Sequence, residues 1–293
     1  MSIIKTFIGD HLSGKADTTR ATYRQELIRF EHWLKGAGTN LSALIKDNVQ
    51  QYLDYLSAQK KSAATVHKTY QVIRSYCRYA GNTKATENIR LIKLPRTLDR
   101  APKSLNKTEL RRILRDINKN GSLRDCAIII LLLNTGLRVG ELTALDRSDI
   151  EIGNRKGRLT VTWGKGEKTA KLPLNNEARR TLSEYLDTRK DDHPALFVSN
   201  RGERISKRAV QHLMERLGVS AHALRHTFIT NLICAGVDIS VVQTLSRHAS
   251  VDMVLRYSKP RDEDLEDALE KIAFQEANNA AKTDPIGNIP KMA

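Results

Sequence analysis

A tyrosine near the C-terminal end of the chain, Tyr257, has three interpretations that its own neighbourhood does not separate. It follows an apolar pattern formed by Val251, Val254 and Leu255, and it stands between a basic and a polar residue. In such surroundings a tyrosine is a half-buried core residue, a ring that contacts a nucleic acid, or a nucleophile. The choice depends on which other reactive side chains the chain offers.

Arg138 and Glu141 lie just beyond a turn signal. The apolar pattern of LLLNTGLRVGEL ends at Thr135–Gly136, two residues before Arg138. One interpretation is a glycine C-cap followed by a surface arginine. The other is a glycine-enforced turn that points Arg138 into a cleft, where Glu141 braces its guanidinium.

Two histidines flank an arginine in the segment HALRHTF. His222 and Arg225 are three residues apart, and His226 lies four residues after His222, so a helix places them on one face. Such a histidine pair is typical of a metal site or, more commonly, of an ordinary surface. The segment lacks the glutamate of the HExxH zinc pattern. A third histidine, His248, precedes Tyr257 by nine residues.

Together with a lysine in the segment GKGEK, these residue types suit attack on a DNA phosphodiester. Two arginines can hold the non-bridging oxygens of the pentavalent transition state bidentately, in place of metal ions. A phenol, with an ordinary pKa of about 10, must lose its proton to attack, and a histidine and nearby cations assist this loss. The departing 5′ oxygen needs a general acid, a role that suits a mobile lysine.

The elements that must position these residues follow from the spacing of apolar side chains. An alternating pattern over 158–163 and 169–174, around a turn rich in glycine and lysine, predicts a β-hairpin with a lysine at its tip. Apolar residues at steps of three and four predict helices, the first of them beginning at about Thr18, over 18–35, 47–58, 62–81, 106–117, 178–186 and 206–217.

These patterns predict a mainly α fold with two domains. We expect an all-helical, DNA-binding domain over 1–90, a basic linker over 91–104, and an α+β domain with a small sheet or hairpin over 105–275. The last residues, 276–293, are polar and expected to be disordered. The two domains together are expected to form a C-shaped clamp around DNA.

Charge indicates the kind of partner. The 293 residues carry a formal net charge of +16, and residues 1–100 contribute +9 of it, from 17 Lys and Arg against 8 Asp and Glu. Such an excess favours a polyanion such as DNA or RNA. A membrane is the weakest alternative, because the longest apolar run, CAIIILLL, is far shorter than a spanning helix needs. Three distant cysteines and no secretory signal indicate an intracellular protein without disulfides or a cysteine metal site.

From about Leu105 to Ser258 the chain resembles the tyrosine recombinases, also called the phage integrase family. The resemblance rests on TGLRVGEL, GKGEKTAKLPL, HALRHTF and the step from His248 to Tyr257, in the family's order and close to its spacings. The basic helical N-terminal part is similar to the family's core-binding domain in character. The resemblance implies an enzyme that cuts and rejoins DNA at specific sites by metal-independent transesterification.

The resemblance also implies a role for each matched residue. Arg138 and Arg225 bind the scissile phosphate, and Glu141 matches the acidic residue that supports them. Lys165 is the general acid, with Lys168 as the second candidate.

The remaining matched residues serve the nucleophile. His222 assists proton transfer at the tyrosine, His248 orients the phosphate, and Tyr257 forms a 3′-phosphotyrosyl link. One position departs from the pattern, because Arg247 stands where many members have the glycine of LGHSS.

Partners and assembly are expected to follow the family. The resemblance implies double-stranded DNA with two inverted half-sites and a homotetramer, two dimers in synapsis, joined through an acidic helix over 262–273. Accessory proteins are compatible with it, and no cofactor or metal is expected because the covalent intermediate conserves the bond energy. Because the helices are expected to start by about Thr18, we expect no arm-binding domain before them, which favours a two-domain enzyme. Such an enzyme would resolve chromosome, plasmid or transposon dimers, or would integrate and excise DNA. We expect it in the bacterial or archaeal cytoplasm, at the nucleoid. The alternatives are a non-catalytic DNA-binding protein and a type IB topoisomerase.

Overall fold

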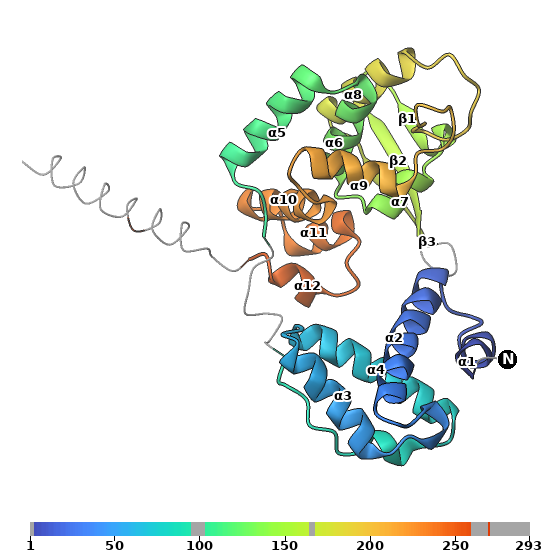
Figure 1. Ribbon diagram of the computed structural model, residues 1–293. Helices are drawn as coiled ribbons and strands as arrows, with labels where there is room; N and C mark the ends of the chain where they lie inside the picture. Colours follow the sequence, from blue (N-terminus) through green and yellow to red (C-terminus); the bar gives the residue numbers. More distant parts are fainter. Residues whose placement is uncertain (1–2, 95–102, 164–167, 259–268, 270–293) are drawn as a thin grey trace, which may run out of the picture. The chain divides into compact units, whose positions relative to one another are not determined.

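The computed structural model describes residues 3–94, 103–163, 168–258 and residue 269 (Figure 1). The chain divides into two compact units between Thr97 and Leu98, and each is described by itself. Four predicted features lie wholly or mostly outside the described residues: the middle of the linker, the hairpin tip with Lys165, the acidic helix over 262–273 and the tail.

The N-terminal unit is helical. It consists of α1 (Ile3–His11), α2 (Asp17–Gly36), α3 (Lys46–Ala58) and α4 (Ala63–Tyr79), with short 3-10 helices η1 (Leu41–Ala43) and η2 (Thr83–Thr86). Residues at helical spacing on α2, among them Leu27, Phe30 and Leu34, are completely buried in its core. The predicted start of the helices at Thr18 is wrong, because Ile4, Phe7 and Ile8 give α1 an apolar face of its own.

The C-terminal unit combines helices with a small sheet. Its elements in chain order are α5 (Lys107–Asn120), α6 (Leu123–Thr135), α7 (Val139–Ala144), η4 (Arg147–Asp149), β1 (Ile150–Ile152), β2 (Gly157–Trp163), β3 (Lys168–Pro173), α8 (Asn176–Asp187), α9 (Lys207–Arg216), α10 (Ala221–Cys234), α11 (Ile239–Ser246) and α12 (Val251–Leu255).

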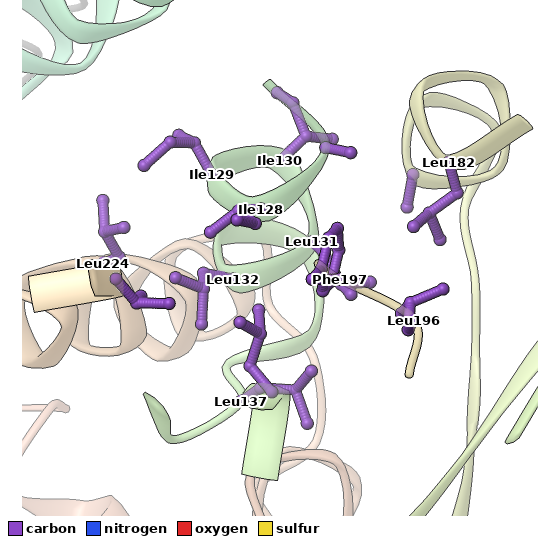
Figure 2. Packing of buried hydrophobic residues seen from close by; sticks show 14 of the residues in the cluster. Ile128, Ile129, Ile130, Leu131, Leu132, Leu137, Leu182, Leu196, Phe197 and Leu224 are labelled. Atoms are coloured by element: carbon purple, nitrogen blue, oxygen red, sulfur yellow. The ribbon is translucent and has the colours of Figure 1, made fainter. Parts of the chain in front are cut away.

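Helix α6 is the centre of this unit. Its sequence is apolar on nearly every side, and a helix with that pattern is stable when other elements surround it. Figure 2 shows Leu224 of α10 on one side of α6 and Leu182 of α8 with Leu196 on the other. The helix ends at Gly136, whose left-handed backbone (φ 58°) and N–H bond to the Leu132 carbonyl form the predicted glycine cap.

The sheet is antiparallel with the strand order β1-β2-β3. Pairs such as Val161 with Ala170 set the register of the predicted β2–β3 hairpin, and Ile150 pairs with Leu159 to add β1. Strand β1 is too short to produce an alternation pattern, so the sequence alone gave no signal for it.

The last three described helices, α10, α11 and α12, gather in one part of the C-terminal unit (Figure 1). A separate apolar cluster joins them, formed by Phe228, Ile229, Val242, Val254 and Tyr257. Val251 and Leu255, which belong to the same apolar pattern as Val254 in the sequence, do not anchor α12, because they are 42% and 40% exposed. The turn after α12 brings Tyr257 into the cluster beside Val254 instead, through a bond from the Tyr257 N–H to the Val254 carbonyl. Across the described ranges, no helix combines the length and the apolar character needed to cross a bilayer.

Candidate active site

The turn after α6 positions Arg138. Leu137 is completely buried, and Arg138 follows it as the residue that precedes α7. Glu141 in the first turn of α7 accepts two hydrogen bonds from Arg138, one from its backbone N–H at 2.8 Å and one from Nη1 at 2.7 Å. Glu141 is buried while the Arg138 side chain is about half exposed, so the carboxylate holds one terminal nitrogen of the guanidinium and the side chain stays open to solvent.

Arg225 reaches the same turn from α10. Its side chain is buried, and its two terminal nitrogens donate to the carbonyls of Gly136 and Ser246. Ser246 is the last residue of α11, and the C-terminal carbonyls of a helix attract a cation. The two predicted phosphate-binding arginines therefore meet at one short segment, Gly136 to Glu141.

A third arginine completes this group. Arg247 donates through Nη2 to Glu141 Oε2 at 3.0 Å and to the Gly136 carbonyl at 3.3 Å. The guanidiniums of Arg138 and Arg247 thus bond to one carboxylate, and that of Arg225 shares the Gly136 carbonyl with Arg247, so the group carries two positive charges in excess. Burial and the charges of Arg138 and Arg247 lower the pKa of Arg225 to about 10, so it still carries its charge at neutral pH.

Glu141 is ionised under the same conditions. Burial alone would raise the pKa of its carboxyl group, but the charge of Arg247 and the hydrogen bonds from Arg138 outweigh this effect. The net result is a pKa below the ordinary value. The site therefore keeps its full set of charges over the neutral range and is suited to an anion.

His248 lies beside the arginines. Its Nδ1 pairs with the Ser246 hydroxyl at 2.8 Å, which leaves Nε2 as the outward nitrogen. Burial and the neighbouring cations, Arg225 first, lower the pKa of His248 to about 4, so the ring is neutral at pH 7. A pocket of about 1060 Å³ opens here, and its walls include Arg138, Thr162, Lys207 and His248.

Tyr257 lies in the apolar cluster of α10, α11 and α12. Its side chain is buried, and its hydroxyl pairs with Nδ1 of His226 at 2.6 Å. Burial raises the pKa of Tyr257, although Arg225 and Arg256 oppose the rise. Burial, aided by His222 and Arg225, lowers the pKa of His226 to about 4, so a neutral His226 is available to accept the phenolic proton.

The structure brings some of the predicted site residues together and leaves others apart. Arg138, Glu141, Arg225 and His248 come together, and Tyr257 lies close by, with its ring 6.2 Å from that of His248. His222 is exposed, and its ring centre is 6.3 Å from that of His226. Lys165 is outside the described residues, and Lys168 is the first residue of β3.

Three residues near the site were missed or left without a role. His226 had a sequence signal, its helical spacing from His222. Arg247 stood out in the sequence only as a departure from the family pattern, and Lys207 had no signal, because the positions of both depend on contacts between distant segments. Within the described part of the chain, no cluster of three His, Cys, Asp or Glu residues is arranged to hold a metal ion.

Comparison with known proteins identifies the family of the chain. Residues 103–264 match the Phage integrase family, and residues 10–84 match the family's N-terminal SAM-like domain. The chain belongs to the phage integrase family. It is a site-specific tyrosine recombinase, an enzyme that cuts and rejoins DNA strands. The matches support neither alternative, the non-catalytic DNA-binding protein or the type IB topoisomerase.

Similar recombinases come from archaea and bacteria. Tyrosine recombinase XerA of Pyrococcus furiosus is 32% identical over 269 residues, which cover 89% of this chain and 90% of XerA. Tyrosine recombinase XerD of Pseudomonas aeruginosa is 30% identical and covers 84% of this chain and 87% of XerD.

Solved structures share the fold of this recombinase. The Tn1549 transposon integrase in complex with a circular intermediate DNA has a TM-score of 0.71 at 19% identity, covering 92% of this chain and 98% of that one. The XerH site-specific recombinase bound to its difH substrate has a TM-score of 0.66 at 23% identity, covering 85% and 78%.

Proposed function

We propose that this recombinase breaks each DNA strand by attack of the Tyr257 oxygen on the scissile phosphorus. A bond forms between the phenolic oxygen and phosphorus, and the bond from phosphorus to the 5′ oxygen breaks. The phenolic proton passes to a histidine, and Lys165, or Lys168 in its place, gives a proton to the departing 5′ oxygen. Attack of a 5′ hydroxyl on the 3′-phosphotyrosyl link reverses these steps and rejoins DNA without ATP, through a Holliday junction.

The meeting of Arg138 and Arg225 at the Gly136–Glu141 segment is the observation that carries this proposal. The surplus of two positive charges suits the transition state of phosphoryl transfer, whose non-bridging oxygens carry extra negative charge. Because the guanidiniums are held by carbonyls and by Glu141 before DNA binds, little reorganisation is needed during the reaction.

Three histidines have the remaining roles in the proposed reaction. His248, neutral and adjacent to both arginines, has Nε2 free of the Ser246 hydroxyl, and Nε2 donates to a phosphate oxygen in the tautomer in which Nδ1 accepts from that hydroxyl. His226 holds the Tyr257 hydroxyl and accepts its hydrogen bond. His222, one turn earlier on α10, assists removal of the proton towards solvent.

A suicide substrate tests the nucleophile. A nicked duplex loses the short fragment beyond the cleavage point, so the covalent protein–DNA adduct accumulates. We expect the adduct with the unaltered enzyme and none with Tyr257→Phe, which still binds the duplex. Tyr185→Phe, a buried tyrosine elsewhere in the C-terminal unit, is the matched control and should keep the adduct. An adduct that persists in Tyr257→Phe refutes the assignment.

We also propose how the enzyme binds its DNA site and assembles on it. Two inverted half-sites each bind one chain, through a core-binding domain over 1–90, a basic linker over 91–104 and a catalytic domain over 105–275. Two such dimers form a tetramer through the helix over 262–273. Mass measurement of the complex on DNA, with and without residues 261–293, tests this assembly, and an unchanged tetramer would exclude the helix.

We further propose that the enzyme acts on the DNA of its host or of a mobile element within the cytoplasm. Integration and excision, and resolution of chromosome, plasmid or transposon dimers, all fit the two-domain chain, with or without accessory proteins. Footprinting on DNA that flanks the native gene would identify the site. Protection of two inverted repeats is expected, and protection of unrelated sequences alone would exclude a dedicated site there.

A further inference from the structure

Arg247 occupies an unusual backbone position. It ends α11 with φ 56° and ψ 41°, in the left-handed region, which disfavours any residue with a Cβ atom. Its N–H donates to the Thr244 carbonyl, and the next N–H, of His248, donates to the Gln243 carbonyl, so the turn closes the helix. A glycine would make this turn with less strain, so the retention of an arginine calls for a reason in its side chain.

The Arg247 side chain is buried among acceptors. It is 1% exposed, although an arginine is seldom buried to this degree. Nη1 donates to the Leu245 carbonyl at 2.9 Å, and Nη2 donates to Glu141 and to the Gly136 carbonyl. The terminal nitrogens are therefore used inside the protein, and Nε is buried as well, so a direct contact with DNA phosphate is excluded for this rotamer.

The two acceptors of Arg247 Nη2, Glu141 and the Gly136 carbonyl, each also bind one of the two arginines proposed to hold the phosphate. Glu141 uses Oε1 for the Arg138 guanidinium, and Oε2 receives both the Arg138 backbone N–H and Arg247. The Gly136 carbonyl receives Arg225 and Arg247. Arg247 is thus the side chain that links the acceptor of Arg138 to the acceptor of Arg225.

We infer that Arg247 is a positioning residue, which fixes Glu141 and the Gly136 carbonyl so that Arg138 and Arg225 hold the scissile phosphate in one orientation. This inference rests on the proposed function. A buried ion pair by itself is weak evidence for stability, since desolvation offsets much of the attraction. The planar guanidinium can satisfy three acceptors at fixed angles, which a lysine ammonium in the same place would do less well.

The test uses the full-length enzyme and a suicide duplex built on its footprinted site. The scissile phosphate is either normal or carries one sulfur in place of a non-bridging oxygen, as each of the two stereoisomers. Sulfur accepts hydrogen bonds poorly, so it slows cleavage when a guanidinium is held firmly against that position. The ratio of the normal to the sulfur rate therefore reports on how well the arginines are placed.

Arg247→Gly is the main variant, because glycine relieves the left-handed strain and so limits damage to the fold. We expect single-turnover cleavage to fall by between about tenfold and hundredfold, the scale on which misplaced groups slow enzymes, with DNA affinity little changed. The sulfur ratio should move towards one for at least one stereoisomer. The cleavage rate of Arg247→Lys should lie between those of the unaltered enzyme and of Arg247→Gly.

Asn88→Gly is the matched control. Asn88 is an exposed, uncharged residue with a similar left-handed φ of 51°, in the N-terminal unit, and its replacement should leave the cleavage rate and the sulfur ratio unchanged. A purely structural role of Arg247 would lower the normal and sulfur rates by the same factor, and that result overturns the inference. An unchanged cleavage rate in Arg247→Gly also overturns it. Absence of any Tyr257 adduct with the unaltered enzyme would instead refute the proposed function.

Discussion

Replacing Gly136 with alanine should destabilise the C-terminal unit through two separate effects. Gly136 has a left-handed backbone with φ 58°, which a Cβ atom opposes. A Cβ atom built there would also lie 2.5 Å from Cδ1 and 3.0 Å from Cε1 of Phe228, well inside van der Waals contact. Because Phe228 is itself buried in the cluster with Tyr257, the ring has little room to move.

The two effects set the expected size. The backbone contributes about 1–2 kcal/mol, and forcing a methyl group into a packed site adds about 1–3 kcal/mol. The free energy of unfolding should therefore fall by about 2–5 kcal/mol, which lowers the Tm of a domain of this size by about 2–4 °C for each kcal/mol.

Gly202→Ala is the control that separates these effects. Gly202 is in the same unit and also has a positive φ, 78°, but a Cβ atom there would meet nothing within 4 Å. Thermal or urea unfolding of the full-length variants should show only the backbone loss, about 1–2 kcal/mol, for Gly202→Ala. Equal losses in the two variants would refute the argument from Phe228. A loss below about 1 kcal/mol in Gly136→Ala would refute the backbone argument as well.

Two further predictions concern the N-terminal core and the histidines. Leu27→Ala removes a completely buried side chain and should lower the free energy of unfolding of the N-terminal unit by about 2–5 kcal/mol. Ile28→Ala, which changes the neighbouring residue with a 51% exposed side chain, should lower it far less. Equal urea midpoints of the two variants would contradict the packing of α2. His226 and His248 have folded pKa values of about 4, below the ordinary value of about 6.5, so the unfolded chain binds more protons and stability falls as the pH drops from about 6.5 towards 4. His226→Gln should make the fall in Tm over this range shallower and should slow adduct formation, since the acceptor at the Tyr257 hydroxyl changes; an identical pH profile would exclude the assigned burial of His226.

Local signals in the sequence predicted the elements that depend on local interactions. Helix α5, predicted over 106–117, begins with a capping box in which Asn106 and Glu109, three positions apart, each accept a backbone N–H. The glycine turn at Gly136 and the β2–β3 hairpin follow in the same way from residues a few positions apart.

Contacts between distant segments were beyond such signals. Arg247 reaches Glu141 across 106 positions, and His226 reaches Tyr257 across 31. The order of catalytic residues along the chain came from the resemblance to a family, whereas the partner of each guanidinium came from the fold. Val251 and Leu255 illustrate the same limit, because their period fits a buried helix face but a five-residue helix buries only Val254.

The sharing of Glu141 by Arg138 and Arg247 also constrains the order in which this site can change by mutation. Loss of Glu141 alone would leave the Arg247 charge buried without its carboxylate, a defect that costs about 3–5 kcal/mol in other buried pairs. That cost is a large fraction of the stability of an ordinary domain, about 5–15 kcal/mol. Loss of Arg247 first, to glycine, relieves a strained backbone and removes the buried charge before Glu141 changes. Lineages that replaced Glu141 by a neutral residue are therefore expected to have lost Arg247 beforehand.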